Sequence, residues 1–557
     1  MGRYSLNRNK DRIFFWVAAI LLLFFRLGDS GPWQSEDRWL EVGREMLASG
    51  KFFKPTINLT SYFDKPLLSY WLELLAAQLS GGLGTLAMRL PSAISALIAL
   101  WSTIALGEKL WSKDSGVIAG WILLTSFGFL QWGRLGEADM ENLAATIVAV
   151  CWYWRQRDRQ HFGNYLTFYL IIAIGAQCKG LTAAAVPLIV ILPDLLKDKR
   201  WKEHLHITHA FAAMIAASVY ALPFNIATAV NGNLDNIAIE QHGWDLVIRE
   251  NIVRYFAPFD HTGSISTYFI AIPQFLFPWS FVFITALIAA RSKKFRDTQN
   301  TGWVLWALGL IFLFFTLSGS RRNYYILPIL PYCALISARF LQEQSDKALH
   351  KWACYLSIAS LATIATLQLI TPLLWPHIEQ SLGQQLPLDL KIITFAVGIA
   401  CIFSLSVIFD RYRNRPHLLT LTIISCALIL WSAFFFRQQF AIDDFRTEMP
   451  FALSLKPLTE QHPTINAAIY REKASGRLLF YSELPLPVQL LNTSEQLQQF
   501  IDTPPYPKLV LAYKKYSNEL PTALRNRQPE LSETQFSWEN NNGDKMLAWL
   551  ISAHPNN

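Results

Sequence analysis

Long apolar runs separated by short polar loops constrain the fold of this chain more than any other feature. A helix needs about 20 mostly apolar residues to cross the hydrocarbon core of a bilayer. The candidate spans are thirteen runs at about 13–27, 85–107, 115–130, 139–154, 164–178, 181–196, 207–228, 268–290, 302–318, 324–341, 351–372, 390–409 and 417–436. Hydrophobic residues make up 52% of the chain and charged residues 16%, whereas soluble domains carry about 25% charged residues. The sequence therefore predicts an all-α polytopic membrane protein and argues against a soluble or disordered chain.

Basic residues fall in every second loop between these runs. They include Arg155, Arg157, Arg159, Lys197, Lys199, Arg200, Lys202, Arg291, Lys293, Lys294, Arg296, Lys347, Lys351, Arg411, Arg413 and Arg415. The positive-inside rule places such loops in the cytoplasm. We therefore expect the N-terminus inside and the chain beyond about residue 440 outside. The net charge of +8 comes from these spaced groups, whereas nucleic-acid-binding proteins cluster their charge on one face or tail, so the sequence argues against nucleic-acid binding.

The first outer loop, at about 28–84, holds charged residues that membrane anchoring does not require. Glu36 and Asp37 open an amphipathic stretch that predicts a helix along the membrane surface, ending at Gly50. The segment Tyr62-Phe63-Asp64-Lys65-Pro66 follows and precedes a second, shorter apolar helix. A phenol, a carboxylate and an ammonium group thus stand together at the start of a helix.

The remaining outer loops bring charges from distant parts of the chain to the same membrane face. They contribute Glu137, Asp139, Glu141, Lys179, Glu250, Arg254, Asp260, His261, Arg321, Arg322, Tyr324 and Tyr325. The fourth loop, at about 229–267, also carries an apolar stripe from Trp244 to Phe256 that predicts another surface helix. Lys and Arg beside a bilayer suit the phosphate of an anionic lipid. Carboxylates suit proton abstraction or coordination of a metal ion, so the pattern predicts a site for a lipid phosphate.

Several motifs in these loops resemble a known family. They are Arg44-Glu45-Met46-Leu47-Ala48-Ser49-Gly50, Tyr62-Phe63-Asp64-Lys65-Pro66, Tyr70-Trp71, and the pattern Ser318, Arg321, Tyr324, Tyr325 and Pro328. The first three resemble the aminoarabinose transferases of lipid A. The last is shared across the wider GT-C superfamily, which includes bacterial relatives of the protein O-mannosyltransferases. The resemblance covers roughly residues 10–340.

The resemblance implies an inverting glycosyltransferase at the periplasmic face of the bacterial inner membrane. Its donor would be a sugar linked to a polyprenyl phosphate, and its acceptor lipid A, another glycan or a protein. It implies catalytic carboxylates at Glu36, Asp37 and Asp139, donor-phosphate binding by Lys65, Arg321, Arg322, Tyr62 and Tyr325, and a divalent metal ion at Asp64 and His261. This chain has Glu36-Asp37 where the family has Asp-Glu, so the sequence leaves open which of the two is catalytic.

A transporter or flippase of lipid-linked substrates is the alternative function. Transporters place their charges near the bilayer midplane, whereas these charges gather at one rim, which favours the enzyme. Single residues also have simpler interpretations. Arg321 and Arg322 could anchor a helix at the interface, and Asp139 could be a helix N-cap.

The composition changes at about residue 441 and becomes that of a soluble domain. Strands are predicted at 476–481, 508–513 and 545–551, and a helix at 494–502. We therefore expect a transmembrane GT-C domain of about thirteen helices over residues 1–440, followed by a small periplasmic α/β domain over 441–557.

Overall fold

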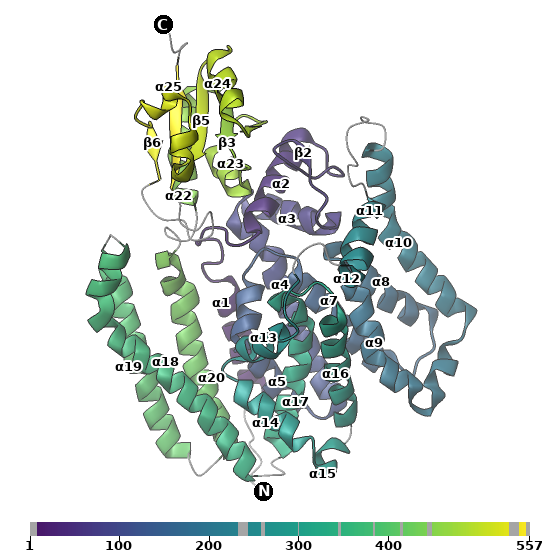
Figure 1. Ribbon diagram of the computed structural model, residues 1–557. Coiled ribbons are helices and arrows are strands. Elements are labelled where there is room, and N and C mark those ends of the chain that lie inside the picture. The colour runs from purple at the N-terminus through teal and green to yellow at the C-terminus, as the bar shows by residue number, and fades with distance from the viewer. Residues whose placement is uncertain are drawn as a thin grey trace.

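The computed structural model is mostly helical, with a small sheet near the C-terminus (Figure 1). It describes residues 8–231, 243–257, 262–298, 300–343, 347–382, 385–412, 416–442, 448–533 and 545–552. His261, one of the predicted metal ligands, lies outside these residues. Figure 1 shows the short elements of the first outer loop between the large helical bundle and the C-terminal sheet.

The bundle is built from apolar helices joined by short connections. It contains α1 (Arg8–Phe24), α4 (Thr85–Leu110), α5 (Lys113–Leu124), α6 (Phe127–Gly133), α7 (Asp139–Gln156), α8 (Phe162–Cys178), α9 (Thr182–Leu196), α10 (Ile207–Asn231), α13 (Thr267–Leu276), α14 (Ser280–Ala289), α16 (Thr301–Leu317), η3 (Asn323–Ile329), α17 (Leu330–Glu343), α18 (Lys347–Leu382), α19 (Leu388–Tyr412) and α20 (Pro416–Ala433). One large apolar core joins α1 to α20 through residues such as Leu23, Leu100, Leu143, Trp279 and Leu335.

Six of the described helices are long and apolar enough to cross a membrane. They are Thr85–Leu110, Ile207–Val230, Asn323–Glu343, Ala348–Gln380, Leu388–Val407 and Leu419–Gln438. The bent pairs α5–α6 and α13–α14 raise the number to eight if each pair is one span, and α8, α9 and α16 are shorter apolar helices. The chain is therefore a multi-pass membrane protein, as predicted. The count of thirteen spans stays a prediction.

Two of the predicted runs, 115–130 and 268–290, are each broken into two helices. The α5–α6 pair bends by 70° and the α13–α14 pair by 114°. At the first break the hydroxyls of Thr125 and Ser126 donate to backbone carbonyls one turn earlier, both at 2.6 Å, a pattern that favours bending. At the second break Pro278 has no backbone N–H to continue a helix. Apolar content alone reports neither bend, so the sequence predicted single spans.

The first outer loop folds into two helices and a small hairpin. They are α2 (Glu36–Ser49), β1 (Thr56–Ile57), β2 (Thr60–Ser61) and α3 (Leu67–Ser80). The helix predicted to end at Gly50 does so in a left-handed conformation, with φ 69°. The apolar stripe of α2, including Val42 and Met46, is buried in one core with residues of α3. That stripe therefore packs against protein rather than facing lipid.

The fourth outer loop forms the second predicted surface helix. It is continuous through α11 (Trp244–Val247), η2 (Ile248–Val253) and α12 (Arg254–Phe256). The middle element is a π-helical turn, and such turns occur frequently at functional sites.

The C-terminal unit, residues 448–533 and 545–552, contains a five-stranded mixed sheet. The strands are β3 (Asn466–Tyr470), β4 (Gln489–Leu491), β5 (Lys508–Tyr513), β6 (Leu531–Ser532) and β7 (Met546–Ile551), and the helices are α22 (Met449–Gln461), α23 (Gly476–Ser482), α24 (Ser494–Asp502) and α25 (Thr522–Arg525). The strand order is β4-β3-β5-β7-β6, with β3 parallel to both neighbours and β7 antiparallel to both of its own. The predicted strands at 508–513 and 545–551 and the helix at 494–502 are confirmed.

The strand predicted at 476–481 is wrong, because this segment is helix α23. The Ser475 hydroxyl caps the helix by accepting a hydrogen bond from the Leu478 N–H at 3.0 Å. Leu478 and its neighbour Leu479 are both fully buried. Adjacent buried residues do not fit a strand with one solvated face, so the helix satisfies this sequence better.

Candidate functional site

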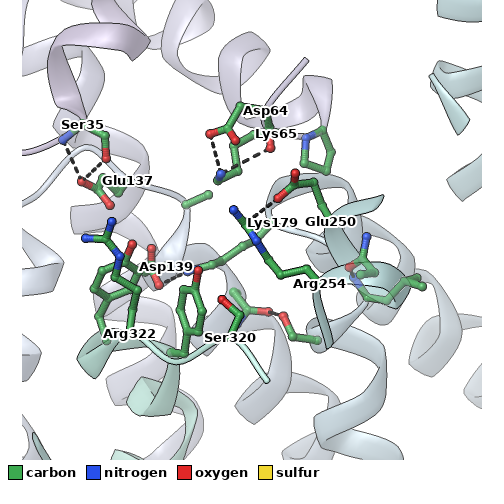
Figure 2. Close-up of a pocket in the computed structure, with 18 of the residues that line it drawn as sticks. Ser35, Asp64, Lys65, Glu137, Asp139, Lys179, Glu250, Arg254, Ser320 and Arg322 are labelled. Carbon is green, nitrogen blue, oxygen red and sulfur yellow. Dashed lines mark hydrogen bonds and ion pairs between the residues drawn. The ribbon is translucent and has the colours of Figure 1, made fainter. Parts of the chain in front are cut away.

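A cavity of about 1130 Å³ lies where the outer loops meet the ends of the bundle helices. Its charged lining residues are Asp37, Arg38, Asp64, Lys65, Glu137, Asp139, Lys179, Glu250, Arg254, Arg322 and Arg477. Figure 2 shows Lys65, Lys179 and Arg254 entering one space, with Glu137 and Arg322 on its other side. The convergence of distant loops, predicted from the charge pattern, is present in the fold.

The two adjacent carboxylates of the first loop face different surroundings. Glu36 is fully buried, and both of its oxygens bind the Arg89 guanidinium, at 2.8 and 2.7 Å. It also accepts the N–H groups of Trp33 and Gly136, at 2.7 and 2.6 Å. Glu36 is absent from the cavity lining, whereas Asp37 belongs to it. Of this pair, only Asp37 can reach a bound acceptor in this arrangement.

Asp64 and Lys65 form an ion pair on the cavity wall. The Lys65 Nζ lies 2.7 Å from Asp64 Oδ2. Burial alone would raise the pKa of Asp64, but the ammonium of Lys65 outweighs it and lowers that pKa. Burial likewise opposes the charged form of Lys65, yet Asp64 raises its pKa above the usual value. Both groups are therefore charged at neutral pH.

Tyr62 stands behind this ion pair rather than on the cavity wall. Its hydroxyl accepts a hydrogen bond from Arg38 Nη1 at 3.0 Å, and Arg38 lines the cavity while Tyr62 does not. Tyr62, predicted to bind phosphate, is thus placed to hold Arg38 in position.

Asp139 and Lys179 form a second ion pair at the cavity. Asp139 begins α7, and Lys179 follows the last residue of α8. The Lys179 Nζ also lies 5.1 and 5.3 Å from the ring centres of Tyr324 and Tyr325, and these cation–π contacts help to hold the side chain in place. Lys179 was not among the residues predicted to bind the donor. The one sequence feature that could have identified Lys179 is its position at the outer end of a helix, where the positive-inside rule makes a lysine unexpected.

The two arginines of the fifth loop point to opposite sides. Arg321 donates to the carbonyl of Thr316, at 3.1 and 3.0 Å, and to that of Gly263 at 3.0 Å. Arg321 therefore stabilises its own loop and does not line the cavity. Arg322 does line the cavity. Arg322 has an extended backbone, with φ −114° and ψ 147°, and successive side chains of an extended chain alternate in direction. The predicted pair of phosphate ligands is thus reduced to Arg322, with Tyr325 beside it.

The fourth loop adds Arg254, which was not among the residues predicted to bind the donor either. Glu250 binds Arg254 one turn later and also Arg249, the latter at 2.8 Å. Asn251 Oδ1 accepts the N–H of Leu181 at 2.6 Å, which ties the π-helical turn to the residues beside Lys179. The π-helical turn therefore links the segment that carries Arg254 to the loop that carries Lys179.

Glu137 is a further cavity carboxylate outside the predicted set. It accepts hydrogen bonds from the Ser35 hydroxyl at 2.8 Å and from the Ser35 N–H at 3.4 Å. Burial, with a smaller contribution from Asp139, raises the pKa of Glu137 to about 7. This carboxyl can therefore hold a proton at neutral pH.

We expect the Glu137→Gln variant to change how stability depends on pH. The folded chain holds the Glu137 proton up to about pH 7, while an ordinary glutamate releases it near 4.5. The stability from the neutral form is thus complete below pH 4.5 and is lost as the pH rises through 7. Wild type should lose melting temperature relative to Glu137→Gln between about pH 5 and 8. Thermal unfolding in detergent measures this, with the exposed Glu530→Gln as the matched control. A constant difference across that range would contradict the assignment.

The described residues do not fit a metal-ion site. Within them, no three His, Cys, Asp or Glu side chains gather closely enough to hold a metal ion. The Asp64 carboxylate, predicted as a ligand, is bound by Lys65, and its predicted partner His261 lies outside the described residues.

Comparison with known proteins agrees with this fold. Residues 64–226 match the family model described as dolichyl-phosphate-mannose-protein mannosyltransferase. The structure of ArnT from Cupriavidus metallidurans bound to undecaprenyl phosphate superposes with a TM-score of 0.73 at 16% identity, covering 96% of this chain and 97% of that one. The chain has the GT-C fold of ArnT. The archaeal oligosaccharyltransferase AglB from Archaeoglobus fulgidus is more distant, with a TM-score of 0.50 at 13% identity over 92% of this chain and 70% of that one.

Curated relatives confirm the resemblance to the aminoarabinose transferases. The undecaprenyl phosphate-alpha-4-amino-4-deoxy-L-arabinose arabinosyl transferase 1 of Pseudomonas fluorescens is 25% identical over 63% of this chain and 62% of its own length. The corresponding transferase of Edwardsiella ictaluri is 28% identical over 60% of this chain and 61% of its own length. The chain thus matches about three fifths of the length of these relatives.

Proposed function

We propose that this protein is an inverting glycosyltransferase that moves a sugar from a polyprenyl phosphate to an acceptor at the periplasmic face of a bacterial inner membrane. The main support for this proposal is that basic side chains from several outer loops line one cavity. A polyprenyl phosphate has an anionic head on an apolar tail, and Arg and Lys beside apolar helices suit both parts. The donors named for the relatives are of this class.

Lys65, Lys179, Arg254 and Arg322 hold the donor phosphate in this proposal. When the bond from the anomeric carbon to the phosphate oxygen breaks, the electron pair stays on the phosphate. Its negative charge therefore grows in the transition state, and fixed cations lower the barrier because they bind that charge most strongly there. Asp64 keeps Lys65 charged and in place, and Asp139 holds Lys179 in place, through the ion pairs described above.

Asp37 acts on the acceptor. A hydroxyl acceptor transfers its proton to the carboxylate as its oxygen attacks the anomeric carbon. A single displacement inverts the configuration of that carbon. A phosphate acceptor, as on lipid A, is already a nucleophile and needs no proton transfer to Asp37. The acceptor classes are lipid A, another glycan or a protein, and the names of the relatives favour aminoarabinose as the sugar.

The orientation in the membrane is part of the proposal. With thirteen spans over residues 1–440 and a cytoplasmic N-terminus, the cavity and the chain over 441–557 would lie outside. The alternation of basic loops supports this orientation. A transporter would hold its charges near the bilayer midplane, whereas this cavity is built largely by outer loops, which favours the enzyme.

Turnover of radiolabelled polyprenyl-phosphate sugars by the purified protein tests this function. We expect release of the lipid phosphate with one sugar, and a loss of about 10²-fold or more in Lys65→Ala and in Lys179→Ala, because each variant removes a cation from the developing charge. Lys51→Ala is the matched control, since Lys51 is exposed in the same loop and does not line the cavity. No turnover of any donor, together with uptake of one donor into vesicles, would favour the transporter.

Chelation tests the metal ion that the resemblance implied. The Asp64 carboxylate is ion-paired with Lys65, and the described His, Cys, Asp and Glu side chains form no cluster of three that could hold a metal ion. We therefore expect phosphate release to persist after EDTA treatment and desalting. A loss that Mg²⁺, Mn²⁺ or Zn²⁺ restores would instead assign a cation to this site.

A further inference from the structure

The C-terminal unit touches the start of α2 beside the cavity. Gly476, the first residue of α23, lies so close that a Cβ atom there would stand 2.6 Å from the backbone oxygen of Asp37 and 3.0 Å from the N–H nitrogen of Arg38. Both neighbours are backbone atoms, which cannot rotate away as a flexible side chain can. Only glycine fits this contact without moving one element against the other.

Arg477, the next residue, reaches the cavity itself. Its backbone N–H donates to Asp37 Oδ2 at 3.3 Å, and its guanidinium donates through Nη2 to the carbonyl of Pro32 at 3.2 Å. The Arg477 side chain is 2% exposed, and the residue belongs to the cavity lining. One residue of the C-terminal unit thus holds both the Asp37 carboxylate and the backbone just before α2.

A second contact fixes the same two parts of the chain. The Asn58 side chain donates to the carbonyl of Val488 at 2.8 Å and accepts the Val488 N–H at 2.7 Å. The Asn58 turn is itself held by the Glu45 carboxylate of α2, which accepts the N–H groups of Asn58 and Leu59 at 2.5 and 3.1 Å. The C-terminal unit therefore meets α2 directly at its first turn and again through the hairpin turn.

We propose that Arg477 is a positioning residue for Asp37, so that the C-terminal unit takes part in the transfer step rather than only covering the cavity. This inference rests on the proposed function of Asp37. With Oδ2 held by the Arg477 N–H, Oδ1 accepts no hydrogen bond from the described residues and is the oxygen left to meet the acceptor. The four cations that hold the donor phosphate come from other loops, and they are Lys65, Lys179, Arg254 and Arg322. Disturbing Arg477 therefore lowers the rate of transfer and leaves donor binding unchanged.

Gly476→Ala in the full-length protein tests this separation. The added methyl group pushes α23 away from Asp37, and a misplacement of about 1 Å in a catalytic geometry costs about 10²-fold in rate. We expect kcat to fall by about that factor, while the KM for the donor and the binding of undecaprenyl phosphate stay within about twofold of wild type, because none of the four cations assigned to the donor phosphate is replaced. Gly309→Ala is the matched control, because a Cβ at Gly309 meets nothing within 4 Å.

Arg477→Ala and Arg477→Lys, each made in the wild-type and Asp37→Asn backgrounds, give a second test. Arg477→Ala keeps the backbone N–H that Asp37 accepts but removes the guanidinium that holds the Pro32 carbonyl, and with it the fixed position of the start of α2. We expect Arg477→Ala to lower kcat by about 10-fold in the wild-type background and by less than about twofold in the Asp37→Asn background, since a residue that acts through Asp37 loses its effect with it. Lysine keeps one donor for the Pro32 carbonyl and should restore part of the rate. Equal losses in both backgrounds would overturn the inference.

The outcomes separate this inference from the proposed function. Full transfer by Gly476→Ala, or a loss of donor binding equal to the loss of kcat, overturns the inference while the glycosyltransferase stands. A wild-type protein that turns over no donor overturns the proposed function and, with it, the role of Asp37. Amide hydrogen exchange in residues 33–40 then tests the contact between α23 and the start of α2 independently of activity. Gly476→Ala should speed exchange there and Gly309→Ala should not.

Discussion

Replacing Asp37 by Asn lowers sugar transfer to a hydroxyl acceptor by about 10³-fold, because a general base typically contributes 10²–10⁴-fold. The substitution keeps the shape of the side chain and its ability to accept the Arg477 N–H, but removes its basicity. The donor-binding cations are untouched, so binding of undecaprenyl phosphate should stay within about twofold of wild type. Phosphate release and donor binding, measured on the same preparation, give the two values.

Asp29→Asn is the control for this result. Asp29 lies in the same outer loop, is exposed, and does not line the cavity. Transfer to a hydroxyl acceptor at the wild-type rate in Asp37→Asn would contradict the general-base role. A loss of less than about tenfold with a phosphate acceptor would instead agree with a nucleophile that needs no deprotonation.

The sequence was most informative where local chemistry decides the structure. Gly50 ends α2 and Pro66 precedes α3 because the conformations of glycine and proline act within one or two residues. The gathering of charges from outer loops at one site was also predictable. Charges at the ends of membrane spans have only two membrane faces to occupy, and burying them in lipid is costly.

The sequence could not tell which members of a motif face the cavity. Glu36 and Asp37 are adjacent carboxylates, and only the position of Arg89 on α4 decides that Glu36 is the buried one. Arg321 and Arg322 are adjacent in an extended backbone, so their side chains point in opposite directions. Arg322 faces the cavity, and Arg321 turns back onto its own loop. These choices depend on tertiary contacts that no spacing encodes.

The contribution of the C-terminal unit was beyond sequence reasoning for a related reason. Arg477 and Asp37 are 440 positions apart, and α23 was predicted as a strand. A strand would have given no reason to place Arg477 at the end of a capped helix beside α2. The error in secondary structure and the missed site residue are thus the same error.

Removing the Arg89 side chain should destabilise the folded protein by about 3–5 kcal/mol, the usual cost of breaking a buried ion pair. The exposed fractions of Arg89 and Glu36 are 2% and 0%, so Arg89→Ala leaves a carboxylate without its cation and without water. Arg89 also donates to the carbonyls of Leu27, Ser30 and Gly31, at 2.9, 3.1 and 2.8 Å. It therefore holds the chain that leads into α2. Chemical denaturation in mixed micelles measures the free energy of unfolding.

The exposed ion pair of Arg12 with Glu108 supplies the comparison. Its side chains are 46% and 25% exposed, and such pairs contribute at most about 1 kcal/mol, so Arg12→Ala should change the free energy of unfolding by no more than that. Replacing both buried partners, as in Arg89→Met with Glu36→Leu, should recover part of the loss because no unpaired charge remains. Equal destabilisation by Arg89→Ala and Arg12→Ala would contradict a structural role for Glu36 and return it to the candidates for catalysis. The same outcome would remove the physical reason for distinguishing it from Asp37.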